Sequence, residues 1–286
     1  FDPRLLPTIA LAVAKAAMDS GVATRPVDLD AYEKSLQGQV FRSFGVMRRV
    51  FDAARAAKRR VVFAEGEDER VLRTAQAMRE DIGVTPILIG RPEVVDSRIE
   101  REGLKLVRGR DFDLVNPEND PRYRDYWQSY HAVMRRRGVS PDLAKMILRS
   151  NTTAIAAVMV HRGEADSMIC GTFGEYRWHL NYVAQVLADK AHHPVAALSL
   201  IILESGPMFI GDTQVHLEPT GQQLAETAIA AARHVRRFGI EPKIALCTRS
   251  QFGNLDNATG RAAREALSIL DAMELNFEYE GEMNID

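Results

Sequence analysis

Apolar runs rich in β-branched residues alternate with segments of helical period in the first part of the chain. Arg60 to Ala64 and Thr85 to Ile89 have the length and composition of buried strands. A helical pattern comes after each of them, at Val71 to Arg79 and at Pro92 to Glu102. Strands and helices that alternate through short connections favour parallel pairing with right-handed crossovers. The pattern therefore predicts an α/β lobe.

A wholly helical stretch interrupts this alternation, which then resumes. The helices expected in that stretch cover residues 121–137, 141–149 and 152–162. Beyond it we expect strands at 167–170, 196–203, 208–211, 243–247 and 276–279, and helices at 178–188, 220–239 and 261–273. Thr220 and Gln223 have the spacing of a capping box. The chain stops soon after the last strand, so this second α/β lobe is expected to be incomplete.

The first 41 residues differ in character from the rest of the chain. Thr8 to Asp19 is a helix rich in alanine and leucine, and Thr24 to Asp30 has the composition of a linker. A basic helix comes next, at Phe44 to Lys58. Its arginines could form a nucleic-acid patch, but apolar residues at helical spacing favour an ordinary amphipathic helix with a solvated basic face.

Charge and composition argue against several classes of partner. The 37 basic and 39 acidic residues give a formal net charge of −2, so no global field attracts nucleic acid or an anionic membrane. No apolar stretch has the length of a membrane span. Cys170 and Cys247 each end an apolar run and are interpreted as reduced thiols, which favours a cytoplasmic location. The chain opens without a methionine or a signal peptide, and we expect it to be part of a longer protein.

Three turns at expected strand ends are candidate ligand sites: Glu65 to Arg70, Gly171 to Gly174 and Thr248 to Asn254. The first is acidic, which is unfavourable for a phosphate, and its Asp68 is expected to cap the next helix. The second lacks both the GxGxxG spacing and the Walker lysine. Asp212 lies at another strand end, where it could face a ligand or form a turn. The seven histidines show no metal-binding spacing, so no metal site is predicted.

Several longer motifs occur together and in order. They are Val61-Val-Phe-Ala-Glu-Gly-Glu-Asp-Glu-Arg-Val-Leu72, Pro86-Ile-Leu-Ile-Gly90, Ala165-Asp166 with Gly171, Phe209-Ile-Gly-Asp212 with Pro219-Thr220, and Phe238-Gly-Ile-Glu-Pro-Lys-Ile-Ala-Leu246. From residue 42 onward, the chain closely resembles phosphate acetyltransferases. The resemblance implies two three-layer α/β/α lobes with mainly parallel sheets, at residues 42–150 and 151–286, the second one truncated.

Residues 1–41 carry a second resemblance. Asp2-Pro-Arg-Leu-Leu-Pro7 and the segment Val13 to Pro26 resemble the end of the catalytic domain of NADP-dependent malic enzymes. A malic enzyme joined to a phosphotransacetylase-like domain describes the bacterial hybrid malic enzymes. That resemblance implies a parent enzyme that oxidatively decarboxylates malate to pyruvate with NADP and Mg or Mn. It also implies that this domain senses acetyl-CoA, inhibits the malic enzyme domain of the same chain and helps to build a homo-oligomer, at least a dimer.

The chain departs from the pattern of active transferases. Their Ser-Gly-Ala turn is Cys170-Gly171-Thr172 here, Glu175-Tyr176 stands in place of their hydroxyl residues, and Asn181-Tyr182 replaces an Arg-Pro pair. Losing an arginine and gaining a carboxylate weaken the positive charge on which phosphoryl chemistry depends. The catalytic Ser-Arg and Asp of the transferases lie in a segment outside this sequence, so no catalytic residue is assigned.

We therefore predict a regulatory acetyl-CoA site without transferase activity and without a metal. The expected ligand-binding residues are Gly171, Thr172, Asn181, Asp212, Thr213, Arg249 and Ser250. Two alternatives stay open. One is an active phosphate acetyltransferase, which would form acetyl phosphate and CoA, and the other is a purely structural assembly module.

Overall fold

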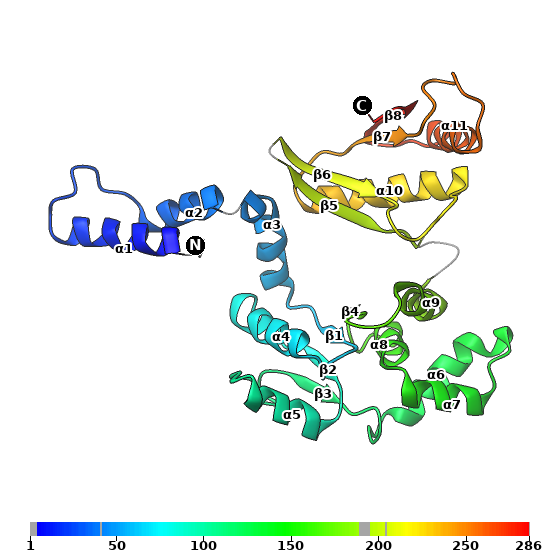
Figure 1. Ribbon diagram of the computed structural model, residues 1–286, viewed down its shortest axis with the longest axis horizontal. Coiled ribbons are helices and arrows are strands. Elements are labelled where there is room, and N and C mark those ends of the chain that lie inside the picture. The colour runs from blue at the N-terminus through cyan, green and yellow to red at the C-terminus, as the bar shows by residue number, and fades with distance from the viewer. Residues whose placement is uncertain (1–4, 41, 189–194, 204, 286) are drawn as a thin grey trace. The chain divides into compact units, whose positions relative to one another are not determined.

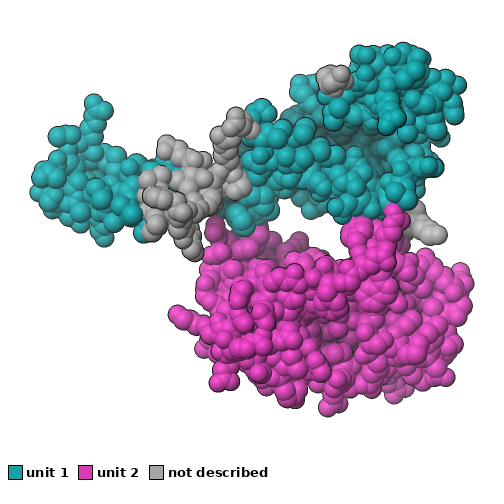
Figure 2. Space-filling model, viewed as in Figure 1, with its two compact units in different colours: residues 1–52, 196–286 teal, residues 53–195 magenta. Residues whose placement is uncertain are grey.

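The computed structural model describes residues 5–40, 42–188, 195–203 and 205–285. They fall into two compact units, which Figure 2 shows in different colours. Unit 1 contains residues 1–52 and 196–286, and unit 2 contains residues 53–195. The chain therefore leaves unit 1, completes the whole of unit 2 and then returns to unit 1.

Unit 2 is built on a four-stranded parallel sheet (Figure 1). Its strands are β1 (Val61–Phe63), β2 (Ile87–Ile89), β3 (Asp113–Val115) and β4 (Ser167–Ile169), in the spatial order β3-β2-β1-β4. In the register of the sheet, Val62 of β1 pairs with Ile87 on one side and Met168 on the other. Because the strands are parallel, the loops after β1 and β4 lie at the same edge of the sheet.

Helices cover both faces of this sheet because successive strand residues point to opposite sides. Phe63 and Leu88 pack with the helices of one layer, whereas Val62 and Ile87 pack with those of the other. The first layer consists of α4 (Glu69–Asp81) and α5 (Pro92–Arg101). The second consists of α6 (Tyr123–Met134), followed by the 3-10 turn η1 (Arg135–Arg137), then α7 (Pro141–Ser150), α8 (Thr152–His161) and α9 (Tyr176–Leu187). Unit 2 therefore has the three α/β/α layers that the resemblance implied.

Helix α8 is the most deeply buried helix of that layer, since every residue from 153 to 159 is buried. Its N-terminus is capped by Asn151, whose side chain accepts a hydrogen bond from the backbone N–H of Ala154 (2.9 Å). Among the described residues, no single helix is long and apolar enough to cross a membrane. Helices α7 and α8 pass that test of length and composition only as a pair, which is bent by 109°.

Unit 1 contains two two-stranded sheets among the residues that the structure describes. Strands β5 (Leu198–Leu203) and β6 (Gly206–Gly211) form an antiparallel hairpin. Strand β7 (Lys243–Cys247) pairs in parallel with β8 (Glu278–Met283). Strand β7 occupies the residues predicted for it, and β8 continues four residues past the predicted end of that strand at Tyr279.

Helices α10 (Gly221–Arg237) and α11 (Ala258–Asp271) pack on each other and on β7. Alanines occupy much of the contact between them and leave room for the larger Leu246 and Leu270. The capping box predicted for α10 is confirmed. The backbone N–H of Gln223 donates to Thr220 Oγ1 (3.2 Å), and the backbone N–H of Thr220 donates to Gln223 Oε1 (2.9 Å).

Three helices form the N-terminal part of the chain: α1 (Leu5–Asp19), α2 (Leu29–Val40) and α3 (Arg42–Ala57). Helix α1 packs on α2, and α3 corresponds to the predicted basic helix. The linker expected at Thr24 to Asp30 is shorter than the sequence indicated. Helix α2 begins at Leu29, where the Asp28 side chain accepts hydrogen bonds from the backbone N–H groups of the next turn.

The α/β class is confirmed, but the internal arrangement differs from the expectation in three ways. The division expected between residues 150 and 151 does not match the two units, because β4 pairs with β1 and so belongs to unit 2. Strands β5 and β6 are antiparallel, because the stretch of chain between Leu203 and Gly206 is far too short for the crossover that a parallel pair needs. The second lobe, expected to be a truncated three-layer lobe with a mainly parallel sheet, has two two-stranded sheets within the described residues.

Candidate functional site

Glu65 lies directly after β1 and is a buried carboxylate, 5% exposed, at the carboxyl edge of the unit 2 sheet. The backbone N–H of Gly171, which comes just after β4, lies 3.1 Å from both Glu65 carboxylate oxygens and donates to them. These contacts tie the loop from Gly171 to Gly174 to the end of β1. The amide of Gly171, a predicted ligand residue, is therefore already used within the chain.

Arg70 ties the same loop to the start of α4. Its Nη2 donates to the backbone carbonyl of Thr172 (2.7 Å), and its guanidinium forms a bidentate pair with Asp68 (3.0 and 2.8 Å). Asp68 also accepts a hydrogen bond from the backbone N–H of Arg70 (2.9 Å), which confirms the predicted cap of α4. The side-chain hydrogen bond from Arg70 lowers the pKa of Asp68 to about 2, so the pair is ionised at neutral pH.

His179 of α9 completes this arrangement, although it is not among the residues predicted from the sequence. The side chain is buried, with Nδ1 2.8 Å from Thr153 Oγ1 and Nε2 2.7 Å from the backbone carbonyl of Phe173. Because a carbonyl can only accept, Nε2 carries a proton and donates to it. Glu65 Oε1 lies 3.9 Å from Nδ1. The available signal was spacing: His179 precedes the buried Val186 by seven residues, which places both on the inner face of α9.

The other two predicted residues of unit 2 have no side-chain hydrogen bond to the described part of the chain. Thr172 Oγ1 is buried without a hydrogen-bond partner, and Asn181 is exposed on α9. Large aromatic side chains are exposed on the same loop and helix start. They are Phe173, Tyr176 and Trp178. None of these aromatic residues is among the predicted ligand residues, all of which are polar residues or glycine.

Cys170 carries a half-buried thiol between β4 and this loop. Burial and the neighbouring Glu65 carboxylate raise its pKa to about 11, and a hydrogen bond with Thr153 acts in the opposite direction. The thiol is therefore protonated at neutral pH and is a poor nucleophile.

Replacing Glu65 with glutamine is expected to bring the pKa of the Cys170 thiol below about 11. The variant removes a negative charge that disfavours the thiolate but keeps an oxygen that can accept a hydrogen bond. The measurement is the rate of iodoacetamide alkylation against pH in a Cys247→Ser background, and the profile should move to lower pH. Glu67→Gln, a charge change in the same turn, is the control and should leave the profile in place. An unmoved profile in Glu65→Gln contradicts the assignment.

In unit 1, the carboxylate of Asp212 is occupied by hydrogen bonds from its surroundings. Its Oδ1 accepts from the backbone N–H groups of Ala197 (2.9 Å), Gln214 (3.3 Å) and Val215 (3.2 Å). Its Oδ2 accepts from the backbone N–H of His216 (3.0 Å) and lies 2.6 Å from His216 Nδ1. The side chain is only 3% exposed. Asp212 thus forms the turn after β6, which is the structural alternative that the sequence had left open.

The electrostatics of Asp212 agree with this role. Burial acts to raise its pKa, but the four backbone N–H donors outweigh burial and hold the pKa below its ordinary value. The neighbouring Thr213 is exposed, and its hydroxyl lies 2.9 Å from the Ser199 hydroxyl of β5. Of these two predicted ligand residues, only Thr213 presents its side chain to solvent.

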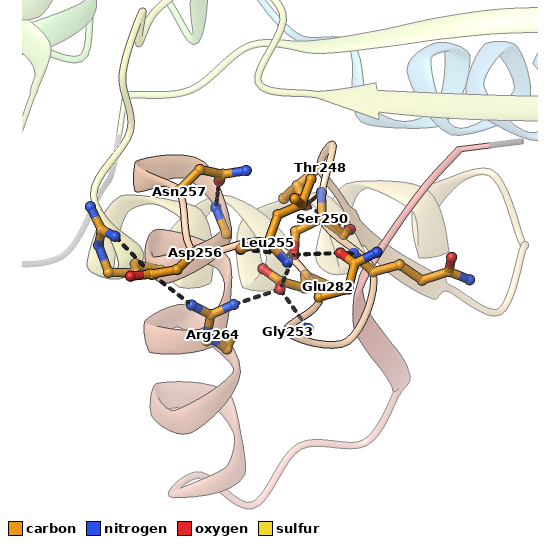
Figure 3. A network of polar contacts seen from close by, with 12 residues as sticks. Thr248, Ser250, Gly253, Leu255, Asp256, Asn257, Arg264 and Glu282 are labelled. Carbon is orange, nitrogen blue, oxygen red and sulfur yellow. Dashed lines mark hydrogen bonds and ion pairs between the residues drawn. The ribbon is translucent and has the colours of Figure 1, made fainter.

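Ser250 lies in a buried polar network between β7 and α11 (Figure 3). Its side chain is fully buried, and Oγ donates to Glu282 Oε1 (2.6 Å). The same carboxylate oxygen accepts from the backbone N–H of Gly253 (2.9 Å) and from Arg264 Nη1 (2.6 Å). The network joins the loop to β8 and α11. Ser250, expected to contact a ligand, is therefore enclosed within the fold because its hydroxyl is needed by a buried carboxylate.

Arg249, the preceding residue, is exposed and has no hydrogen bond or ion pair with any residue that the structure describes. The turn that separates the two side chains is held by Thr248. Its Oγ1 accepts from the backbone N–H of Ser250 (2.9 Å) and donates to the backbone carbonyl of Ser250 (3.0 Å). The loop thus buries Ser250 and leaves the guanidinium of Arg249 available to an anion.

The seven predicted ligand residues are divided between the two units. Gly171, Thr172 and Asn181 belong to unit 2, whereas Asp212, Thr213, Arg249 and Ser250 belong to unit 1. A single cleft shared by both groups stays a prediction. Within the described residues, no group of three or more His, Cys, Asp and Glu side chains is arranged to hold a metal ion.

The family model described as "Phosphate acetyl/butaryl transferase" matches residues 45–286. The chain belongs to this family. Solved structures agree with that fold: a phosphotransacetylase from Streptococcus pyogenes (25% identity, TM-score 0.71) matches 83% of this chain and 73% of its own, and EutD phosphotransacetylase from Staphylococcus aureus (23% identity, TM-score 0.71) matches 84% and 72%.

The relatives identify the particular kind of chain in which this domain occurs. It is 48% identical to the NAD-dependent malic enzyme of Rhizobium meliloti (strain 1021) and 46% identical to the NADP-dependent malic enzyme of Salmonella typhimurium. Both matches cover 100% of this chain but 38% of the malic enzyme. A phosphate acetyltransferase of Synechocystis is 28% identical over 87% of this chain and 36% of its own length. The predicted phosphotransacetylase-like part of a hybrid malic enzyme is thereby confirmed.

Proposed function

We propose that the chain is a regulatory and assembly domain of a hybrid malic enzyme, that it senses acetyl-CoA and that it lacks transferase activity. The observation that carries this proposal is that the chain belongs to the transferase family and yet matches malic enzymes over its whole length. A retained transferase fold joined to a malic enzyme is well suited to bind an acyl-CoA and report on its concentration.

The chemistry of the strand-end residues supports binding over catalysis. Cys170 is protonated at neutral pH, Ser250 is enclosed, and the Asp212 carboxylate is saturated by backbone donors. None of these three groups is poised as a nucleophile or a base. Glu175 and Asn181, where transferases carry hydroxyl and Arg-Pro residues, further reduce the positive charge that phosphoryl chemistry needs.

Arg249 supports the binding half of the proposal. CoA carries several phosphates, and an exposed guanidinium without a carboxylate partner among the described residues is a suitable contact for one of them. Thr213 is a further proposed contact in unit 1, where the enclosed Ser250 and Asp212 would support the loops that carry Arg249 and Thr213. The proposed contacts in unit 2 are Gly171, Thr172 and Asn181.

Inhibition of a malic enzyme by acetyl-CoA requires the ligand to bind one arrangement of the enzyme more tightly than another. Coupling of this kind typically amounts to about 1–3 kcal/mol. On this proposal the malic enzyme domain of the same chain is the partner and binds the dinucleotide and Mg or Mn, and the protein is a cytoplasmic homo-oligomer, at least a dimer. One of these relatives is named an NAD-dependent malic enzyme and the other an NADP-dependent malic enzyme, and we propose NADP as the dinucleotide of the parent enzyme.

Arg249→Ala is expected to weaken acetyl-CoA binding about three- to tenfold, since an exposed charged contact contributes about 1 kcal/mol. The measurement is isothermal titration calorimetry on the full-length protein. Arg233→Ala, which removes another exposed arginine of unit 1, is the control and should leave the affinity unchanged.

Three outcomes would overturn the proposal. An absence of binding at millimolar acetyl-CoA removes the sensor. Release of CoA from acetyl-CoA and phosphate by the purified protein establishes an active transferase instead. Bound acetyl-CoA that leaves malic enzyme activity unchanged separates binding from regulation and favours a structural assembly module, whereas binding that is unchanged in Arg249→Ala places only Arg249 outside the site.

A further inference from the structure

The loop that carries Arg249 contains a turn with an unexpected residue in it. Phe252 has a φ of +47° and Gly253 a φ of +84°. The backbone N–H of Asn254 donates to the carbonyl of Gln251 (3.2 Å), which closes a four-residue turn around these two residues. Positive φ at both central positions is the pattern of a type I′ turn, whose first central residue is usually glycine, asparagine or aspartate. A phenylalanine in that place holds backbone strain.

Acceptors on β8 fix this strained turn from within the fold. The backbone N–H of Phe252 donates to the backbone carbonyl of Glu282 (2.8 Å), and that of Gly253 donates to the buried Glu282 carboxylate (2.9 Å) (Figure 3). The Phe252 side chain is nevertheless 62% exposed. Among the described residues, Lys58 also has a positive φ, but it directly follows α3, where a left-handed residue is common. Strained residues that their surroundings hold in place cluster at ligand sites, which makes Phe252 a candidate.

Arg249 lies in the same loop and is free to bind an anion. Three residues separate it from Phe252, so the two Cα atoms are at most about 11 Å apart. The loop also contains Asp256, but this carboxylate is paired with Arg261 (2.7 Å) and Arg264 (3.6 Å) of α11. Arg249 is exposed and forms no ion pair with any residue that the structure describes. The loop therefore presents an aromatic ring and a guanidinium without a counter-charge within a short distance of each other.

An aromatic ring beside such a guanidinium is suited to a phosphorylated nucleoside, because the base can stack on the ring while a phosphate accepts from the guanidinium. In acetyl-CoA this description fits the adenosine, which carries a 3′-phosphate and a 5′-diphosphate. We propose that Phe252 stacks on the adenine ring of acetyl-CoA while Arg249 contacts an adjacent phosphate. The inference rests on the proposed function, because it takes acetyl-CoA as the ligand. It implies that this loop recognises the nucleotide end of the ligand and not its acetyl group.

Isothermal titration calorimetry on the full-length protein tests the inference with acetyl-CoA and with adenosine 3′,5′-bisphosphate, which reproduces the nucleotide end. Phe252→Ala is expected to weaken the binding of both ligands at least about fivefold, because it removes the stacking of the base. Phe252→Trp keeps an aromatic face and should keep the affinity of the unaltered protein. Leu255→Ala is the matched control: it removes another exposed apolar side chain of the loop, 49% exposed, and should leave both affinities unchanged.

The NADP proposed for the parent enzyme also contains a phosphorylated adenosine, but its extra phosphate is on the 2′ oxygen. Adenosine 2′,5′-bisphosphate is therefore titrated in parallel. If it binds more tightly than the 3′,5′ isomer and loses affinity in Phe252→Ala, the loop recognises the dinucleotide and the assignment to acetyl-CoA is overturned.

Affinities that are unchanged in Phe252→Ala, or that fall equally in Leu255→Ala, would also overturn the inference. The same titrations keep it apart from the proposed function. Tight acetyl-CoA binding and inhibition that do not depend on Phe252 contradict only the stacking contact. Binding of both ligands through Phe252, with malic enzyme activity unchanged by acetyl-CoA, contradicts only the sensor.

Discussion

Replacing Glu282 with alanine is expected to lower the free energy of unfolding by about 2–4 kcal/mol. The carboxylate is completely buried and accepts hydrogen bonds from Ser250, Gly253 and Arg264 (Figure 3). Its removal leaves the backbone N–H of Gly253 without its acceptor, and the buried Ser250 hydroxyl must donate to Asn254 Oδ1 (3.2 Å) or the Leu255 carbonyl (3.1 Å) instead. Arg264 is 39% exposed and can be partly rehydrated. The decrease in the free energy of unfolding should therefore be smaller than the decrease caused by breaking a fully buried ion pair.

The unfolding transition in urea, followed by circular dichroism, measures this loss. Glu278→Ala is a matched control on the same strand, because Glu278 is 75% exposed and pairs with Lys243 at the surface (2.9 Å). A pair of that kind contributes about 0–1 kcal/mol. Similar losses in the two variants would show that the buried network does not stabilise unit 1.

The sequence contained enough information for much of this fold, but not for its shortest or most polar elements. Strand β7 was predicted at its observed residues because Lys243 to Cys247 is a clear apolar run between polar turns. Strand β3 was missed because three residues, Asp113 to Val115, are too few for alternation to be visible. The first two residues of helix α2, Leu29 and Asp30, fall in the predicted linker, since the sequence of α2 is polar and its stability comes from packing on α1.

The candidate site was harder to predict, because sequence does not show which way a polar side chain points. Ser250 and Arg249 are adjacent and looked equally suitable, yet one is enclosed and the other exposed. The cause is Glu282, which lies 32 residues further along the chain and comes close only when β7 pairs with β8. Asp212 differs, since its turn was local enough for the turn-forming alternative to be stated beforehand.

Gly66→Ala is expected to lower the free energy of unfolding by about 2–3 kcal/mol, at the upper end of the range for overpacked sites. A Cβ at Gly66 would lie 2.8 Å from the backbone N and O of Ile89 and from Leu88 Cβ. Backbone atoms of a paired strand cannot move aside as a flexible side chain can, so β1 and β2 must separate. The hydrogen bond from Gly66 N–H to the Ile89 carbonyl (3.0 Å) would be lost or lengthened.

Gly163→Ala is the control for Gly66→Ala, because it introduces backbone strain without crowding. Gly163 has a φ of +73° and nothing within 4 Å of its would-be Cβ, so alanine there costs only the strain of the left-handed region, about 1 kcal/mol. Thermal and urea unfolding should therefore rank Gly66→Ala as the more damaging change. If Gly66→Ala lowers the free energy of unfolding no more than Gly163→Ala does, the ends of β1 and β2 can separate at little cost.

Amide hydrogen exchange at Gly171 tests the same prediction at the candidate site. Glu65 precedes Gly66, and its carboxylate accepts the Gly171 N–H only while the end of β1 keeps its position. Crowding at Gly66 should therefore speed exchange at Gly171, whereas Gly163→Ala should leave that amide protected. Because the loop after β4 is held by contacts from β1 and α4, any ligand that binds beside it depends on the absence of a side chain at Gly66.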